Sequence, residues 1–175
     1  MILSLRKNKD YFLLSTPVML FFLIFITFLK IYALYISPLE LSVDEAQYWN
    51  WSNKIEFGYF SKPPLIAWLI SISTSIFGNE EWSVRIFSPI IHLFISLILW
   101  ATSSEIFDRK SGVYAALIWA LLPITSFGSF IISTDTPLLF FWSVCLLSII
   151  KIINHRHKYW SIILGICMGL GFLSK

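Results

Sequence analysis

The sequence predicts an all-α integral membrane protein with about five transmembrane helices and two short interfacial helices in its first outer loop. Of its 175 residues, 57% are hydrophobic and only 13% are charged, and the mean hydropathy is +0.77. Soluble domains carry about 25% charged residues, so this chain has too few charges to cover a surface that faces water. The formal net charge is +3 and the basic residues are scattered, which argues against a nucleic-acid partner.

Five apolar segments approach the length of roughly 20 residues that a membrane-spanning helix requires. They cover residues 11–36, 83–103, 111–130, 135–153 and 159–174. The first segment follows a basic cluster, as in a signal peptide, but it is too long for one and no cleavage site is obvious, so we expect it to be retained. Because the chain stops at Lys175, directly after the fifth segment, we expect a longer protein whose C-terminal part is absent.

The distribution of Lys and Arg predicts the orientation of the chain in the membrane. With the N-terminus inside, the inner positions hold Arg6, Lys7, Lys9, Arg109, Lys110, Lys151, Arg156 and Lys158. The outer loop, residues 37–82, holds only two bases, Lys54 and Lys62. Its acids are Glu40, Asp44, Glu45, Glu56, Glu80 and Glu81. We therefore expect a cytoplasmic N-terminus and an outward-facing acidic loop.

The first part of the outer loop has the pattern of a capped helix. Ser42 and Glu45 have the spacing of a capping box, which predicts a helix that begins near Val43. In that helix Asp44, Tyr48 and Trp51 share a face. Tryptophan is enriched at the level of the lipid headgroups, so we expect this helix at the membrane surface.

The second helix expected in the outer loop covers residues 63–78. Its predicted apolar stripe consists of Leu65, Ile66, Leu69, Ile72 and Ile76. The opposite side carries Ser71, Thr74, Ser75 and Gly78. The segment is short for a membrane span and has a polar side, so we expect it to lie in the interface plane.

Two acids are the first candidates for chemistry. Asp44 lies in the first turn of the first loop helix, and Asp135 at the outer start of the fourth span. Helix capping is one explanation for either acid, because a helix N-terminus stabilises a carboxylate. The other explanation is a site: two acids at one membrane level can bind a divalent cation, or one can act as a base.

Lys62 is the candidate cation. It precedes Pro63 and Pro64, so its backbone is held extended at the start of the second loop helix. A fixed ammonium at the headgroup level suits a phosphate, whereas a snorkelling lysine is the alternative. Arg85 is a weaker phosphate candidate, and Lys175 lies on the same outer side. Lys30 is expected to extend outward to the headgroups.

Four stretches together resemble the N-terminal part of bacterial family-39-type glycosyltransferases. They are DEAQYW (44–49), GYFSKPPLIAWL (58–69), STDTP (133–137) and GLGFLSK (169–175). These enzymes have the GT-C fold and are related to protein mannosyltransferases and to the lipid A aminoarabinose transferase. The resemblance runs from about Tyr11 to the end of the chain.

The resemblance implies a multi-pass enzyme of the bacterial inner membrane with a periplasmic active site. Such an enzyme transfers a sugar, with inversion, from a polyprenyl-phosphate carrier to a lipid, a cell-envelope glycan or a protein. Asp44 matches the acid that activates the acceptor hydroxyl, directly or through a divalent metal, and Asp135 matches a second acid near the site. Lys62 matches the residue that contacts the carrier phosphate. Glu45 and Tyr59 are the remaining candidate substrate contacts.

Two other classes of function remain open on the sequence alone. A transport component for a lipid-linked sugar would carry charges in the middle of its spans, and those regions are nearly uncharged here. A non-catalytic membrane protein requires no convergence of polar residues. The transferase hypothesis, in contrast, predicts that Asp44, Asp135 and Lys62 converge on one outward cavity that opens to the bilayer.

Overall fold

The computed structural model describes residues 15–155 and 158–175, and every regular element in that part of the chain is a helix. Three helical stretches are long and apolar enough to cross a membrane. They are α2 (Thr16–Ile36), the continuous run of α5 (Glu81–Arg85) with α6 (Phe87–Ile106), and α9 (Asp135–His155). The all-helical class expected from the sequence is therefore confirmed for the described residues, and these three stretches are candidate membrane spans.

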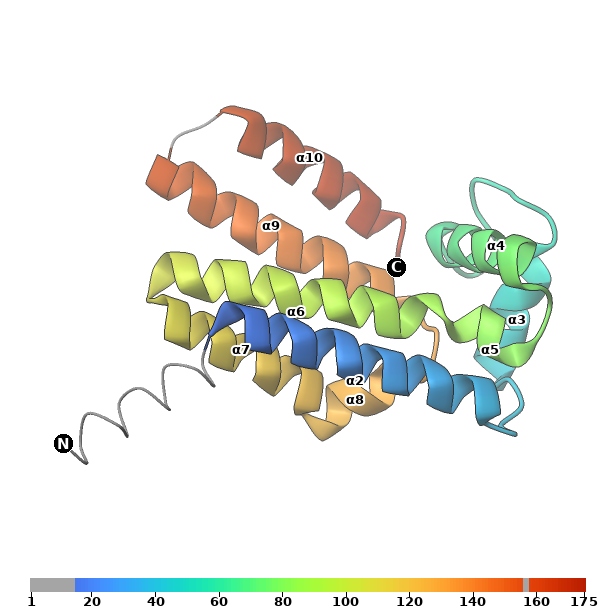
Figure 1. The fold of residues 1–175 in the computed structure, drawn as a ribbon. Coiled ribbons are helices and arrows are strands. Elements are labelled where there is room, and N and C mark those ends of the chain that lie inside the picture. The colour runs from blue at the N-terminus through green and yellow to red at the C-terminus, as the bar shows by residue number, and fades with distance from the viewer. Residues whose placement is uncertain (1–14, 156–157) are drawn as a thin grey trace.

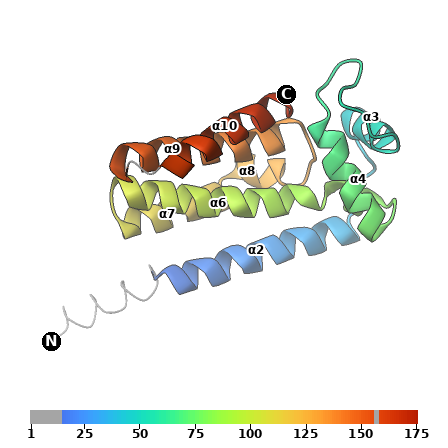
Figure 2. The same cartoon turned by 90° about the horizontal axis from the view of Figure 1, so that it is seen from above.

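The long helices form a bundle with α6 at its centre (Figures 1 and 2). Helix α6 packs against α7 (Arg109–Leu121) on one side and against α9 on the other. Helix α10 (Lys158–Phe172) packs on the far side of α9. The N-terminal cluster of the core joins Met19 and Leu23 of α2 to α7.

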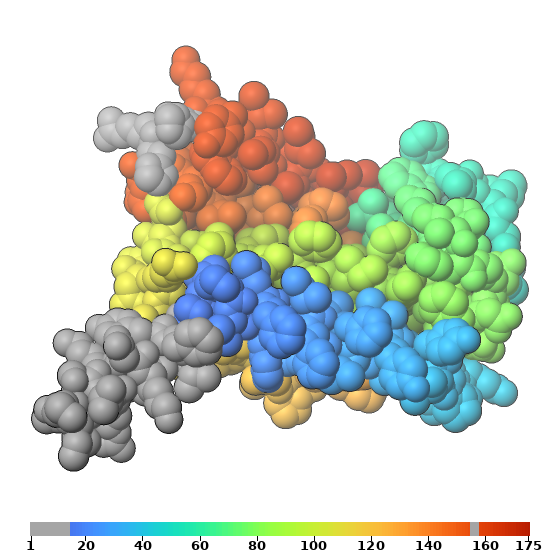
Figure 3. Space-filling view, in the orientation of Figure 1, coloured from blue at the N-terminus to red at the C-terminus, as the bar shows by residue number. Residues whose placement is uncertain are grey.

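Helix α2 lies on the outside of the bundle (Figure 3). Its outer face is apolar, with Phe21, Ile24 and Phe28 all exposed. Contiguous exposed apolar surface of this kind is unusual on a soluble protein but is expected where lipid covers the helix. The part of the first span that precedes Ser15 lies outside the described residues, as do the inner bases Arg6, Lys7, Lys9 and Arg156.

Three shorter helices cover one end of the bundle, at the right of Figure 1. They are α3 (Val43–Ser52), α4 (Leu65–Phe77) and the short α5. Their common core consists of Tyr48, Ile66, Ile70, Val84 and Ile132. This cluster includes a residue from the segment before α9, so the outer loop and the start of α9 are packed as one unit.

The apolar stripe expected for the second loop helix is only partly correct. The residues of α4 that are fully buried are Ile66, Ala67, Ile70 and Ser73. Ile72 and Ile76 are exposed instead. The helix is apolar on more than one side, so the period of the sequence pattern did not show which side packs against α3.

The third expected span, 111–130, is not one helix. Helix α7 ends at Leu121, and α8 (Pro123–Gly128) begins after a break at Leu122, whose φ of −59° and ψ of 129° are not helical. Pro123 explains the break, because proline disfavours the helical conformation at the residue before it and cannot donate a backbone hydrogen bond. The α7 carbonyl of Ala120 accepts a hydrogen bond from the Ser126 hydroxyl at 3.0 Å.

Candidate functional site

The capping box at the start of α3 is confirmed. The Ser42 hydroxyl accepts a hydrogen bond from the Glu45 amide at 3.4 Å, and the Glu45 carboxylate accepts one from the Ser42 amide at 3.0 Å. Both bonds satisfy N–H groups that a helix start would otherwise leave unpaired. They fix the start of α3 and therefore the position of its first turn, which carries Asp44.

Glu45 does more than cap this helix, because its carboxylate is buried and forms an ion pair with Arg85. The backbone amide of Ile132 also donates to Glu45 Oε1, at 3.0 Å. Burial alone would raise the pKa of Glu45, but the hydrogen bonds from Arg85, Ser42 and Ile132 outweigh it and lower the pKa. Arg85 also donates to the carbonyls of Leu39 and Glu40, at 2.9 and 2.8 Å, so most of its N–H groups are paired within the protein.

The residue before Glu45, Asp44, is exposed and lies on the face of α3 that carries Tyr48. Tyr48 is only 3% exposed. Burial raises the pKa of the Tyr48 phenol, and the negative charges of Asp44 and Asp135 raise it further, against smaller opposing effects of Lys175 and Thr134. Two acids from separate elements therefore act electrostatically on one phenol.

Asp135 is the first residue of α9, and Pro137 lies in the same first turn. Asp135 is paired with a lysine that follows the end of α10. The Lys175 ammonium lies 2.6 Å from Asp135 Oδ1. The two side chains are 52% and 56% exposed, so the pair faces outward. The sequence placed Lys175 on this side but gave no sign of its partner, because the antiparallel packing of α9 and α10 creates the contact.

Lys62 lies in the turn that leads into α4, and its backbone carbonyl accepts a hydrogen bond from the Tyr59 amide at 3.2 Å. The amide of Leu65 donates to the carbonyl of Leu173 at 3.2 Å, so this turn is joined to the chain just before Lys175. Lys62 is half-buried, and within the described residues no ion pair links it to either acid. The structure thus brings the Lys62 turn to the end of α10 without a direct contact to Asp44.

Tyr59 is held within the outer loop. Its ring stacks on Trp51, with the ring centres 5.0 Å apart and the planes at 9°. Its hydroxyl donates to the Lys54 carbonyl at 2.8 Å and accepts from the Glu56 amide at 3.2 Å. These contacts shape the turn before Lys62.

An apolar groove of about 250 Å³ runs between α9 and α10 and ends at Lys175. Its walls are formed by Leu138 and Trp142 on one side and by Met168 and Phe172 on the other. Cys145 and Cys167 lie deeper in the same groove, and both are free thiols. A charged rim above an apolar groove is compatible with a ligand that has a charged head and a lipid tail.

The acids do not form a preassembled metal centre in the part of the chain that the structure describes. Within that part, no group of three or more His, Cys, Asp and Glu side chains is arranged to hold a metal ion. Any cation at Asp44 and Asp135 would need further ligands from a substrate or from water.

Comparisons with known proteins place these residues in a family context. Residues 61–175 match the model of a family described as dolichyl-phosphate-mannose-protein mannosyltransferase. A lipid A galacturonosyltransferase of Rhizobium johnstonii is 33% identical over 150 residues, which are 85% of this chain and 32% of that protein.

An undecaprenyl phosphate-alpha-4-amino-4-deoxy-L-arabinose arabinosyl transferase of Wigglesworthia glossinidia brevipalpis is 31% identical over 146 residues. That match covers 78% of this chain and 25% of the relative. The chain therefore spans about a third or less of the length of these curated relatives. No solved structure matches the chain.

Proposed function

Since this chain belongs to the dolichyl-phosphate-mannose-protein mannosyltransferase family, we propose that it takes part in transferring a sugar from a polyprenyl-phosphate carrier to a periplasmic acceptor, with inversion at the sugar. The acceptor is a lipid, a cell-envelope glycan or a protein. Of these, a lipid is favoured, because one of the relatives is a lipid A galacturonosyltransferase. The carrier is favoured by the relative whose name includes undecaprenyl phosphate.

The observation that carries the proposal is that the hydrogen bond from Ile132 to Glu45 joins α3, which carries Asp44, to the segment before Asp135, and that both acids act on the Tyr48 phenol. A non-catalytic membrane protein has no need for two exposed acids from separate elements at one place. A transferase that uses an activated donor needs a base for the acceptor and a cation for the leaving group. Asp44 supplies the base, and the Lys62 turn near the end of α10 supplies the cation.

In the proposed step, Asp44 accepts the proton of the acceptor hydroxyl. The acceptor oxygen forms a bond to the anomeric carbon, and the bond from that carbon to the carrier phosphate breaks. The phosphate leaves with the electron pair, and the Lys62 ammonium stabilises its developing charge. Attack from the face opposite the phosphate gives inversion.

The other candidate residues have supporting roles in this proposal. Asp135, oriented by Lys175, contacts the sugar or the acceptor beside Asp44. Both oxygens of the Glu45 carboxylate are bonded within the protein, so we assign Glu45 to holding α3 in place instead of to a substrate contact. Tyr59 shapes the turn of Lys62.

A divalent cation remains part of the proposal. Mg²⁺ is commonly bound by one or two carboxylates together with substrate phosphates, and Asp44 and Asp135 are a ligand set of that kind. Such an ion would polarise the phosphate or the acceptor oxygen. Loss of transfer on chelation with EDTA, and recovery with Mg²⁺ or Mn²⁺, would support this part.

The proposed membrane arrangement has five crossings in a bacterial inner membrane, with the N-terminus in the cytoplasm. The three long apolar stretches make three of the crossings. The broken pair α7–α8 and the shorter helix α10 make the other two. Helices α3, α4 and α5 then lie at the periplasmic surface, where the lipid-linked donor is presented.

The proposal is tested by replacing Asp44 in the protein at its native length, in membranes supplied with a polyprenyl-phosphate sugar. We expect Asp44→Asn to lower the rate of transfer by about 10²–10⁴-fold, which is the usual contribution of a general base. The matched control is Glu56→Gln, an exposed acid in the same loop. Full transfer by an inserted Asp44→Asn protein would refute the role of Asp44.

A further inference from the structure

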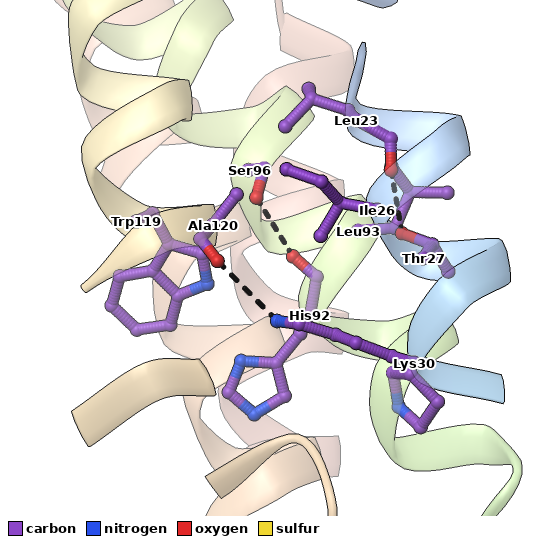
Figure 4. A pocket seen from close by; sticks show the side chains of 10 residues that line it. Leu23, Ile26, Thr27, Lys30, His92, Leu93, Ser96, Trp119 and Ala120 are labelled. Atoms are coloured by element: carbon purple, nitrogen blue, oxygen red, sulfur yellow. Dashed lines mark hydrogen bonds between the residues drawn. The ribbon is translucent and has the colours of Figure 1, made fainter. Parts of the chain in front are cut away.

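Lys30 of α2 does not extend outward to the headgroups, contrary to the expectation from the sequence. Its side chain turns into the bundle, and its ammonium donates a hydrogen bond to the Ala120 carbonyl at 3.4 Å (Figure 4). A charged group within a membrane-spanning helix is costly unless polar partners surround it. The proposed transfer step gives no reason for a lysine with polar partners at this position.

The ammonium lies in a cavity between α2, α6 and α7. The polar side chains that line this cavity with Lys30 are Thr27, His92, Ser96 and Trp119. The His92 ring stacks on the Trp119 ring, with the centres 5.8 Å apart and the planes at 22° (Figure 4). The cavity volume is about 10 Å³, close to the smallest volume of about 10–15 Å³ that accommodates one water molecule.

Two groups around the cavity have N–H bonds without a partner among the described residues. The buried indole N–H of Trp119 has no hydrogen-bond partner. The Lys30 ammonium has three N–H groups and makes its one hydrogen bond to Ala120. The hydroxyls of Thr27 and Ser96 donate to backbone carbonyls of their own helices, so their oxygens can still accept. One water would pair these groups, because it can accept from Lys30 and Trp119 and donate to a hydroxyl oxygen.

The cavity lies where the C-terminal end of α7 faces α2. Ala120 is in the last turn of α7, just before the break at Pro123, where the carbonyls form the negative end of the helix. The N-terminal half of α2 is fixed by apolar contacts of Met19 and Leu23. After Leu23, the next buried residue of α2 is Leu34. In the C-terminal half of α2, Lys30 therefore provides a polar contact that attaches this helix to α7.

We propose that Lys30 and one bound water lock α2 to the break between α7 and α8, and that this polar lock positions Asp44. Residues 37–41 join the end of α2 to the cap of α3 at Ser42, and Arg85 binds the carbonyls of Leu39 and Glu40 in this segment. In this proposal a shift of α2 along its axis acts on Asp44 through these residues. In this proposal Lys30 is a positioning residue; its effect on transfer rests on the proposed function, whereas the lock itself does not.

The lock is tested by amide hydrogen exchange of the purified protein in nanodiscs. Lys30→Met removes the donors, Lys30→Arg keeps a charged donor, and Trp119→Phe removes only the indole N–H. We expect exchange in residues 30–45 to be about tenfold to a hundredfold faster in Lys30→Met, close to wild type in Lys30→Arg and intermediate in Trp119→Phe. Exchange in α9 and α10 should be unchanged in all three. The matched control is Lys54→Met, which removes a lysine that is 85% exposed.

Each outcome of the exchange experiment decides a part of the proposal. Wild-type exchange in Lys30→Met overturns the lock. Faster exchange in Lys30→Met with wild-type exchange in Trp119→Phe overturns the role of the water. If Lys30→Met does not fold, then the exchange of Trp119→Phe, which retains the aromatic stack on His92, still tests the site.

The effect on chemistry is measured in the transfer assay. A misplaced base predicts that Lys30→Met lowers kcat by about tenfold to a hundredfold while the KM for the donor stays unchanged, and that Lys30→Arg restores kcat. An unchanged kcat in Lys30→Met overturns the positioning of Asp44. If the wild-type protein transfers no sugar from a polyprenyl-phosphate donor, the proposed function fails, and the exchange experiment still decides the lock.

Discussion

The carboxylate of Glu45 and the guanidinium of Arg85 form a buried, two-point ion pair. Arg85 Nε donates to Oε1 at 2.9 Å, and Nη2 donates to Oε2 at 2.8 Å. The side chains are 1% and 7% exposed. The pair joins α3 to α5, and the hydrogen bond from Ile132 adds the segment before α9. Three parts of the chain that carry or flank the candidate site therefore depend on one carboxylate.

Replacing Glu45 by glutamine should destabilise the protein strongly. The amide keeps the size of the side chain but leaves the buried guanidinium without a counter-charge. Breaking such a pair from one side costs about 3–5 kcal/mol. Thermal unfolding in detergent should show a clear fall in Tm, whereas Glu56→Gln, at an exposed pair with Lys54, should unfold like the wild type. Equal Tm values for the two variants would contradict the importance of the pair.

The same pair predicts how stability depends on pH. The bonds from Arg85 and two backbone amides hold the pKa of Glu45 below its ordinary value of 4.5 despite the opposing effect of burial. The folded protein therefore binds this proton less readily than the unfolded chain. The contribution of Glu45 is complete above pH 4.5 and is lost as the pH falls from there through the folded pKa.

This dependence is measured as the difference in Tm between the wild type and Glu45→Gln over a series of pH values. The difference should be largest at neutral pH and should shrink as the pH falls below 4.5. A difference that stays constant on acidification would mean that the pKa of Glu45 is the same in the folded protein and in the unfolded chain.

Gly112 is the point at which α7 approaches α6 most closely. A Cβ at this position would lie 2.6 Å from the Trp100 carbonyl oxygen and would also collide with the Ser104 hydroxyl. The hydroxyl can rotate away, but the backbone carbonyl cannot. Gly112→Ala should therefore destabilise the protein by about 1–3 kcal/mol, as overpacking usually does. Gly165→Ala is the control, because nothing lies within 4 Å of its added Cβ, and its Tm should be unchanged or higher.

Patterns of neighbouring residues predicted the start of α3 in the outer loop, whereas contacts between residues far apart in the chain could not be predicted from the sequence. The capping box of Ser42 and Glu45 is set by residues three apart, so both of its bonds were predictable. Arg85 lies 40 residues from Glu45, and nothing in the spacing marks the pair. The break at Leu122 was predictable from Pro123, but counting apolar residues over 111–130 concealed it.

The candidate site shows the same division. Charge and hydropathy predicted one membrane level for Asp44 and Asp135, which stays a prediction, and Tyr48 was visible as a residue on the same face as Asp44. That Lys175 would pair with Asp135 depends on how α10 returns along α9, which no local pattern specifies. Lys30 turns inward to the Ala120 carbonyl, which lies beside the break in α7 and also accepts from Ser126, a partner that the sequence pattern of α2 alone does not contain.

The pair of Asp135 with Lys175 gives a last prediction, which separates a role in transfer from a role in stability. Because both side chains are about half exposed, losing the pair should change the free energy of unfolding by no more than about 1 kcal/mol. If Asp135 contacts the substrate and Lys175 orients it, Asp135→Asn should lower kcat more than Lys175→Met does. The double variant should be no worse than Asp135→Asn alone, because Lys175 then has nothing left to orient. Additive losses in the double variant would show that Lys175 acts independently of Asp135, and full transfer by Asp135→Asn would remove the second acid from the site.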